Sequence, residues 1–441
     1  MVSLLLFWES HMKHTKRLIY GLLTVAAALG GLSTAQAQAD VPRRELSIGE
    51  ALQLGQINIP QLVRARTEQK VVESKKEGAA LWLSQNPYAT VLLGSRKETT
   101  SDPVAAGVQY QVHIEQALEI AGQRWTRLAA VASQVEVAKA QTELAQVESR
   151  ALLLSAYVQA SFAEQRVAVA RGREETADRL LGSARTRLEL GATGELEVNL
   201  AQIELGRVRG ERVQAEVLMS SRQTGLGILC GLPASTPLLL STSHALPPVL
   251  EVAPLDDLYL LAETERADLQ AIRRQEVALK SEEARLRREA VPSLILAFDY
   301  QRDLPGQTFL GGTVGLTLPM WNRNQGPLAQ VHATEQQRQA EERLLRTRIR
   351  GEVALASRKL QLLRVQVQEF QQNVLPPAER NMELLRRGWQ AGKFDLFRVI
   401  TASRELTETR LRLLDLLEDL WVAAIELERA VGAPLLQGVP S

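Results

Sequence analysis

The chain is poor in the residues that cross-link or fill a compact core. It has 441 residues, a single cysteine at Cys230 and only 4% aromatic residues. One cysteine excludes a disulfide framework and a cysteine-rich metal cluster, and it does not lie where a lipid-modified cysteine would follow an export signal. The formal net charge is +1, so there is no broad electrostatic reason to expect nucleic acid as a partner.

Long hydrophobic runs are also missing from most of the chain. After residue 40 no apolar stretch reaches the ~20 residues that a membrane-spanning helix requires. Any part of the later chain that crosses a membrane must therefore do so as strands. The abundant residues are instead Ala, Leu, Glu, Gln and Arg in stretches without turn residues, a mixture typical of long packed helices.

The N-terminus has the pattern of an export signal. Basic residues at 13–17 precede an apolar run at 18–32, and small residues alternate with glutamine up to Ala37 and Ala39. This pattern predicts a signal peptide over 1–39, cleaved near Ala37 or Ala39. The alternative is a membrane-anchoring helix, although the apolar run is shorter than a bilayer span.

Strand-like alternation occurs in two places. Residues 108–115 alternate apolar with polar, and the same period recurs at 294–301 and 308–318. We predict β-hairpins at 88–118 and 293–318, with strands of about ten residues, the length of a tilted strand across a bilayer. Any one strand taken alone favours an ordinary half-buried sheet in a soluble domain, and four strands of this length in two hairpins of an exported chain reverse that preference. Four strands are too few for a closed membrane barrel, which needs roughly eight, so copies of the chain must associate.

Helices account for most of the remaining chain. Residues 124–190 contain no proline, and 325–391 form a second long helical stretch in which Pro376 and Pro377 predict a kink or break. Shorter helices are predicted at 195–229 and 395–431 and, before each hairpin, at about 47–84 and 255–290. The apolar spacing of 3 and 4 residues favours coiled-coil seams, although a plain helical bundle fits that spacing too.

The two halves share one plan. An offset of 201 residues places Gly191 on Gly392 and Gly231 on Gly432, and the hairpins keep nearly the same spacing. We predict a first repeat at 40–233, a Pro-rich linker at 234–254, a second repeat at 255–434 and a short tail at 435–441. The predicted fold class is an α+β membrane protein with two tandem repeats, each with a strand hairpin and long antiparallel helices.

Two phrases mark where a strand is followed by a helix. The first repeat has Gly122 and Arg124 there, and the second has a longer set: Pro319, Asn322, Arg323, Asn324 and Gly326. The second phrase, with 375–379, resembles the strand-to-helix and tip signatures of the TolC-like outer-membrane efflux proteins across essentially the whole mature chain. The first phrase is similar to the heavy-metal-efflux subgroup of that family.

The resemblance implies a homotrimer in the outer membrane of a Gram-negative bacterium. Each protomer would supply four strands to a 12-stranded barrel in outer-membrane lipid and helices to a periplasmic tunnel. The implied partners are a periplasmic adaptor and an inner-membrane resistance-nodulation-division pump. The implied function is passive exit of heavy-metal cations, with drugs or other small molecules as the alternative cargo.

Two helix breaks are expected to form the periplasmic tips. We assign to the tips and gate Gly191, Gly194, Glu195, Glu197, Gly392, Asp395 and Arg398. Glycine permits the reversal between antiparallel helices. In the family an acidic residue precedes the valine after each break, and here Val198 follows Glu197 whereas Val399 follows Arg398. We therefore expect Arg398 to pair with an acid across protomers, or these charges merely to solvate a helix end.

Enzyme chemistry has no support in the sequence. His113, His244 and His332 are scattered, without metal-ligand spacing, and no nucleophile and base can be grouped. We therefore predict neither enzymatic activity nor a cofactor or metal site. Two competing functions are a periplasmic adaptor and a coiled-coil envelope scaffold without a pore. An adaptor should end in a β domain, whereas this chain ends in a helix near Val431.

Overall fold

The computed structural model describes residues 44–96, 107–240, 253–303 and 307–436. The predicted signal peptide and most of the C-terminal tail lie outside the described residues. The described helices and strands all belong to the one unit that begins at Arg44. Within the described ranges, none of the helices combines the length and the apolar character that a bilayer span requires.

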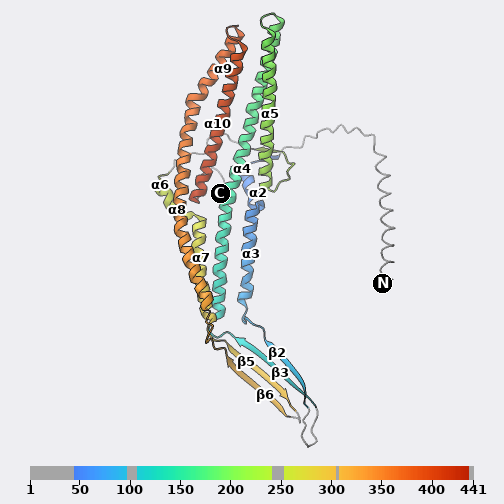
Figure 1. Cartoon of the computed structure of the whole chain (residues 1–441), viewed down its shortest axis with the longest axis vertical. Helices are drawn as coiled ribbons and strands as arrows, with labels where there is room; N and C mark the ends of the chain where they lie inside the picture. Colours follow the sequence, from blue (N-terminus) through green and yellow to red (C-terminus); the bar gives the residue numbers. More distant parts are fainter. Residues whose placement is uncertain (1–43, 97–106, 241–252, 304–306, 437–441) are drawn as a thin grey trace, which may run out of the picture. The chain divides into compact units, whose positions relative to one another are not determined.

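Four strands form one antiparallel sheet with the order β2-β3-β5-β6, as Figure 1 shows. Their bounds are Tyr88–Arg96 for β2, Gly107–Leu118 for β3, Leu294–Arg302 for β5 and Thr308–Leu316 for β6. Each hairpin pairs internally, and β3 pairs with β5. The predicted hairpins are confirmed, and the two repeats meet at the centre of the sheet.

The register sorts the strand residues onto two chemically different faces. Ile114 lies opposite Ala89 and Phe298, whereas its neighbour His113 lies opposite Thr90 and Asp299. One face is thus mainly apolar and the other carries most of the polar side chains, together with Leu92 and Phe309, because neighbouring residues of a strand point to opposite sides. The apolar face is uncovered in a single protomer: Leu93 is 71% exposed and Val314 is 72% exposed.

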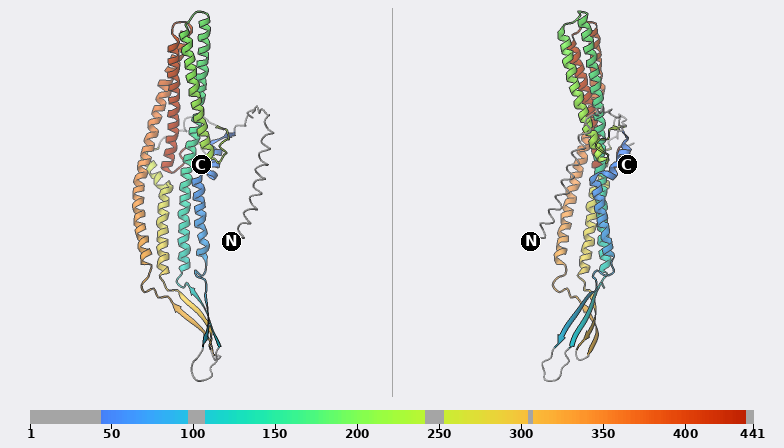
Figure 2. Two further views of the ribbon diagram at one scale, coloured as in Figure 1. Left: turned by 45° about the vertical axis from the view of Figure 1, so that its right-hand side comes forward. Right: turned by 90° about the vertical axis from the view of Figure 1, so that its right-hand side faces the viewer.

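Helices make up the rest of the described unit. Their bounds are α2 Ile48–Asn58, α3 Pro60–Ala80, α4 Gln123–Glu189, α5 Glu195–Leu229, α6 Leu255–Glu265, α7 Ala267–Glu289, α8 Gln325–Glu369, α9 Leu375–Gln390 and α10 Leu396–Val431. Next to the sheet, α3, α4, α7 and α8 lie side by side in that order (Figures 1 and 2). At the opposite end the hairpins α4-α5 and α9-α10 pack on each other. The 67 residues of α4 span roughly 100 Å.

The helices break at three places. The second long helix is interrupted by a π-helical turn at Phe370–Val374, directly before Pro376, which confirms the predicted break. The stretches predicted as continuous at 47–84 and 255–290 are each divided, at Ile59 and at Arg266. Ile59 is extended because a following proline disfavours the helical region. Arg266 adopts nearly the same angles, with φ −61° and ψ 117°.

Backbone conformation repeats in the two halves. Among the described residues, the positive φ angles fall into pairs at equivalent places: Gly122 and Asn324, Gly191 and Gly392, Gly231 and Gly432. The first pair precedes α4 and α8, the second lies at the helix tips, and the third ends α5 and α10. Because left-handed backbone is unfavourable for most residues, these matched positions show that the repeats share local geometry as well as element order.

A central core joins the repeats at the middle of the unit. Its largest fully buried side chains include Leu46, Leu153, Leu226, Leu269 and Leu427. The short strand β1 (Arg44–Leu46) pairs in parallel with β4 (Leu238–Leu240), which lies inside the segment predicted as a linker. The Tyr157 hydroxyl donates to the Leu46 carbonyl at 3.0 Å, so this small sheet is attached to α4.

Candidate pore face and helix tips

The polar face of the sheet carries linked side chains from three strands. His113 Nδ1 lies 2.7 Å from Asp299 Oδ1, and the Thr313 hydroxyl donates to Asp299 Oδ2 at 3.1 Å. Glu115 Oε2 is 3.5 Å from His113 Nε2. The sequence interpretation treated His113 as isolated, because its partner is 186 residues away. The part of this face around His113 and Asp299 is hydrophilic and suits contact with water. Within the described part of the chain no cluster of His, Cys, Asp and Glu is suited to hold a metal ion.

The first strand-to-helix junction is built around Gly122 and Arg124. Gly122 has φ 77°, and the next residue but one, Arg124, stacks its guanidinium 4.7 Å from the ring centroid of Trp82 and 5.2 Å from that of Trp125. Arg124 Nε also donates to the Ala80 carbonyl at the end of α3, at 3.1 Å. Arg124 therefore joins the helix that enters the hairpin to the helix that leaves it.

The second junction repeats part of this geometry with different residues. Asn324 has φ 61°, its N–H donates to Asn322 Oδ1 at 3.1 Å, and its side chain donates to the Leu286 carbonyl at 2.9 Å. Arg323 Nε donates to the Pro319 carbonyl at 3.1 Å. A Cβ at Gly326 would meet no other atom within 4 Å. The structure thus brings Pro319, Asn322, Arg323 and Asn324 into one turn, and it shows no steric need for glycine at 326.

The helix tips end in matching glycine caps. Gly191 N–H donates to the Leu188 carbonyl at 2.9 Å and Ala192 N–H donates to the Arg187 carbonyl at 2.8 Å, and the same pattern recurs at Gly392. These are the bonds of a helix C-cap that needs left-handed backbone at the glycine. Gly194 differs, because its φ of −97° is open to any residue. The predicted role of glycine in chain reversal therefore applies to Gly191 and Gly392.

The predicted tip charges are only partly brought together. Asp395 caps α10, since its Oδ1 accepts from the Arg398 N–H at 3.0 Å, and Arg398 Nε lies 4.0 Å from the same oxygen. Both side chains are well exposed. Glu195 is exposed, whereas Glu197 is half-buried. One Glu197 oxygen, Oε2, is enclosed without a hydrogen-bond partner in the described structure. Pairing across protomers stays a prediction.

A second, smaller core joins the tips of the two repeats. Its buried members come from α4, α5, α9 and α10: Ala177, Leu180, Leu181, Ala184, Ala201, Leu205, Val208, Trp389, Leu396, Val399 and Ile400. Arg187 Nη1 donates to the Trp389 carbonyl at 2.7 Å, and its guanidinium lies 5.3 Å from the indole centroid. Sequence reasoning missed this contact because no local pattern links residues 202 positions apart.

A buried ionic cluster lies further from the tips. Glu204 of α5 accepts from Arg207 at 2.5 Å, from Arg173 of α4 at 3.1 Å and from Arg404 of α10 at 3.2 Å. Burial by itself raises the pKa of the Glu204 carboxyl. The bonds and charges of these guanidinium groups more than offset that effect, and the pKa lies below its ordinary value.

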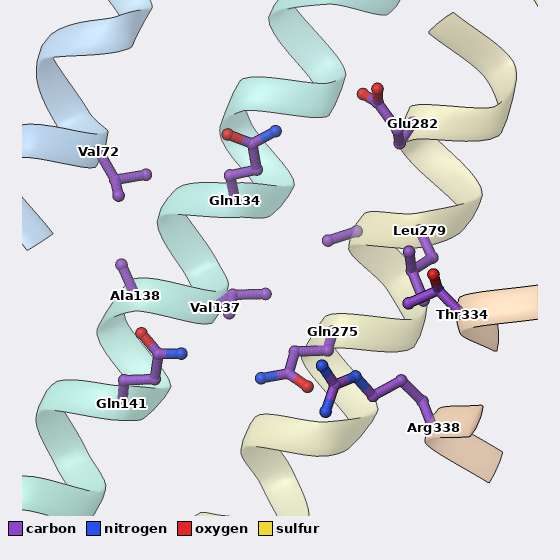
Figure 3. Close-up of a pocket in the computed structure, with 11 residues that line it drawn as sticks. Val72, Gln134, Val137, Ala138, Gln141, Gln275, Leu279, Glu282, Thr334 and Arg338 are labelled. Carbon is purple, nitrogen blue, oxygen red and sulfur yellow. The ribbon is translucent and has the colours of Figure 1, made fainter. Parts of the chain in front are cut away.

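The helical wall beside the sheet contains a cavity of about 350 Å³ between α3, α4, α7 and α8. In Figure 3, Gln134 and Gln141 of α4 lie across from Gln275 and Glu282 of α7, and Arg338 of α8 extends toward Gln275. Amides and aliphatic groups dominate the lining. No nucleophile with an adjacent base lines it, so this described cavity gives no support for catalysis.

This architecture is similar to that of solved outer-membrane channel proteins. No family model matches the chain. The cobalt-zinc-cadmium resistance protein CzcC of Cupriavidus metallidurans is 27% identical over 351 residues, which cover 79% of this chain and 81% of CzcC. The solved structure of CusC, described as a transmembrane channel, has a TM-score of 0.69 at 17% identity and covers 88% of this chain and 92% of its own.

The outer-membrane protein VceC of Vibrio cholerae gives the same result. Its TM-score is 0.69 at 15% identity, covering 88% of this chain and 96% of VceC. The predicted resemblance to TolC-like outer-membrane efflux proteins and the predicted fold class are confirmed. It is similar to channel proteins, not to enzymes.

Proposed function

We propose that three copies of the chain close into one tube, with twelve strands in the outer membrane and a helical tunnel in the periplasm. The observation that carries the proposal is the four-stranded sheet with one uncovered apolar face and one polar face. Its outer strands, β2 and β6, each leave one edge unpaired in the described protomer. Unpaired backbone groups are not tolerated in hydrocarbon, so neighbouring copies must cover these edges.

The number of copies follows from the space that a pore needs. Two copies would give eight strands, and the interior of an eight-stranded barrel is largely filled by side chains. Three copies give twelve strands and leave room for water beside the polar face that carries His113, Glu115 and Asp299. Such a conduit lets a charged cargo pass because it replaces hydrocarbon with water.

Heavy-metal cations are the proposed cargo, delivered by an inner-membrane pump of the resistance-nodulation-division type through a periplasmic adaptor. The name of CzcC, a cobalt-zinc-cadmium resistance protein, supports this choice over most of the chain length. The helix tips are the proposed end for docking and gating, with Asp395, Arg398, Glu195 and Glu197 as the charges at the entrance. Ionised rings of this kind set ion selectivity in pores.

Two experiments test the proposal. The purified full chain, reconstituted in planar bilayers, should form ion-conducting pores, and its mass in detergent should correspond to three protomers. A monomer without conductance would contradict the tube. Deletion of the gene should sensitise the cell to divalent cobalt, zinc or cadmium. Unchanged metal tolerance together with lost tolerance to a drug or dye would overturn the proposed cargo and leave the channel intact.

A further inference from the structure

Indole side chains are concentrated on the surface where strands meet helices. The chain has 6 tryptophans, and three at the junctions are largely exposed: Trp82 at 79%, Trp125 at 68% and Trp321 at 83%. Trp82 lies shortly before β2, Trp125 shortly after β3 and Trp321 shortly after β6. Large apolar side chains so exposed in a single protomer indicate a surface that contacts something other than bulk water.

Arg124 occupies the space beside two of these indoles. Its guanidinium lies within 5.2 Å of both ring centroids, and its only hydrogen bond among the described residues is the one from Nε to the Ala80 carbonyl. The two terminal nitrogens therefore retain donors for a ligand. The neighbouring Arg127 differs, because it donates to the Glu119 carboxylate and to the Ala79 and Leu81 carbonyls. Its donors are thus used to connect the end of α3 to the segment that follows β3.

We propose that Trp82, Arg124 and Trp125 bind the phosphate of a phospholipid headgroup. Arginine presents paired N–H donors that match phosphate oxygens, and stacking on indoles holds the guanidinium in place. Tryptophan prefers the membrane interface, where its ring contacts apolar chains and its N–H contacts headgroups. The inference rests on the proposed crossing of the membrane by the sheet, and it adds a lipid site to that function.

Continuity with the strand face argues for a lipid over a soluble phosphate. On the apolar face of the sheet β3 ends at Leu118. Arg127 joins the residues next to this strand end, Glu119 and Leu81, and there Leu81 is 56% exposed and Ile120 is 57% exposed. A free phosphate ion would satisfy Arg124 but would leave these apolar side chains and both indoles in water. A headgroup satisfies the charge while its acyl chains cover the apolar residues. Because the helices extend from this end, the lipid belongs to the periplasmic leaflet.

The second repeat offers a matched control. Arg323 lies in the equivalent strand-to-helix segment and carries the same charge. Its side chain donates to the Pro319 carbonyl, and no aromatic ring in the described part of the chain stacks on it. Replacing Arg323 therefore removes a cation at the same junction level without removing the paired indoles. If replacing Arg124 weakens lipid binding more than replacing Arg323, the phosphate binds at a specific site. Equal losses would indicate a general attraction of positive charge to negative lipid.

The test uses the purified full-chain oligomer titrated with dioleoylphosphatidylglycerol, with bound lipid counted by native mass spectrometry. Dioleoylglycerol, which lacks the phosphate, is titrated in parallel, and inorganic phosphate is added as a competitor. The variants are Arg124→Gln, Arg124→Lys, Arg323→Gln and the double change Trp82→Leu with Trp125→Leu. Circular dichroism melting curves establish that each variant folds. If Arg124→Gln does not fold, Arg124→Lys is compared with the parent in its place.

We expect Arg124→Gln to weaken phosphatidylglycerol binding roughly tenfold, because a charge-assisted bond pair is lost. Arg124→Lys and the double tryptophan variant should lose less, roughly threefold. Arg323→Gln should bind phosphatidylglycerol as the parent does. Binding of dioleoylglycerol should be the same in the parent and in every variant. Equal binding by Arg124→Gln and the parent, equal losses at Arg124 and Arg323, or displacement of the lipid by millimolar inorganic phosphate would overturn the site. A parent chain that forms no pore would instead contradict the proposed function.

Discussion

Arg187 Nη1 donates a hydrogen bond to the main-chain carbonyl of Trp389 at 2.7 Å, and this bond joins the end of α4 to the end of α9. The repeat explains why only one half of the molecule can make it. Gly388 occupies the position equivalent to Arg187, and a Cβ there would lie 2.2 Å from the Phe394 ring. One tip therefore supplies the connecting side chain and the other supplies the carbonyl and the close packing.

Replacing Arg187 with methionine should loosen the tip of α9. The variant keeps an aliphatic chain against Trp389 but removes a charged donor, a loss of about 1–2 kcal/mol. Amide hydrogen exchange over 385–391 should become roughly tenfold faster. Arg185→Met is the control, because Arg185 is exposed on the same helix. Similar exchange in both variants would show that the bond contributes nothing to tip stability.

Alanine at Gly191 or Gly392 should destabilise the folded chain by about 1–2 kcal/mol each. Both glycines have positive φ, 67° and 74°, and neither Cβ would meet an atom within 4 Å, so the cost is one of backbone strain alone. Thermal unfolding in detergent measures it. Gly172→Ala, inside α4 and also in open space, should instead stabilise by about 0.5–1 kcal/mol. A stabilising Gly191→Ala would contradict the observed caps.

Asp395 has two roles that two substitutions separate. Asparagine keeps the cap on the Arg398 N–H but removes the charge, whereas alanine removes both. Asp395→Ala should cost about 1 kcal/mol in unfolding free energy, and Asp395→Asn very little. Both should reduce the preference of the pore for cations, measured from reversal potentials across a salt gradient. Glu405→Gln changes an exposed acid elsewhere on α10 and should leave the cation preference unchanged. If both Asp395 variants keep the selectivity of the parent, the tip charges only solvate the helix ends.

The Glu204 cluster should make the helical region sensitive to acid. The pKa of Glu204 is lower in the folded chain than its ordinary value of 4.5. A lowered folded pKa contributes stability above the unfolded pKa, and that contribution is lost as pH falls below 4.5 through the folded value. Glu204→Gln should cost about 1–3 kcal/mol at pH 7.

Melting curves of the parent and Glu204→Gln at pH 7, 5, 4 and 3 measure this effect. The difference between the two melting temperatures should shrink steadily at the acid end. Glu211→Gln, which changes a more exposed acid of the same cluster, should have a smaller effect at every pH. A constant difference from pH 7 to 3 would show that the Glu204 charge does not contribute to stability.

Local patterns were enough to predict the strands and the long helices. The period-2 alternation of β3 places Ile114 and His113 on opposite faces, and the absence of proline in α4 permits an unbroken helix. The break at Ile59 also has a local signal, because Pro60 follows it. These features depend on residues close together in sequence, so a single sequence carries them.

Features set by distant contacts could not be predicted in the same way. Arg266 is held at its break by Asp268, Glu352 and the Ala430 carbonyl, and two of these partners lie in other helices. The three-residue strands β1 and β4 are too short to show a period. At the site, the glycine caps were predictable, but the bond from Arg187 to Trp389 and the pairing of His113 with Asp299 join the two repeats. They follow from packing, which no local pattern encodes.

The order β2-β3-β5-β6 has a consequence for how strands pair between the subunits of a ring. Within a protomer, the seam between repeats joins the second strand of the first hairpin to the first strand of the second hairpin. Between protomers, β6 of one would meet β2 of the next in antiparallel sense, and this too joins a second strand to a first strand. Six hairpins would then follow one another around the circle with the same kind of junction each time. In such a trimer, all the contacts between neighbouring hairpins would be of one kind, as in a ring of six identical units. Its subunits meet head to tail.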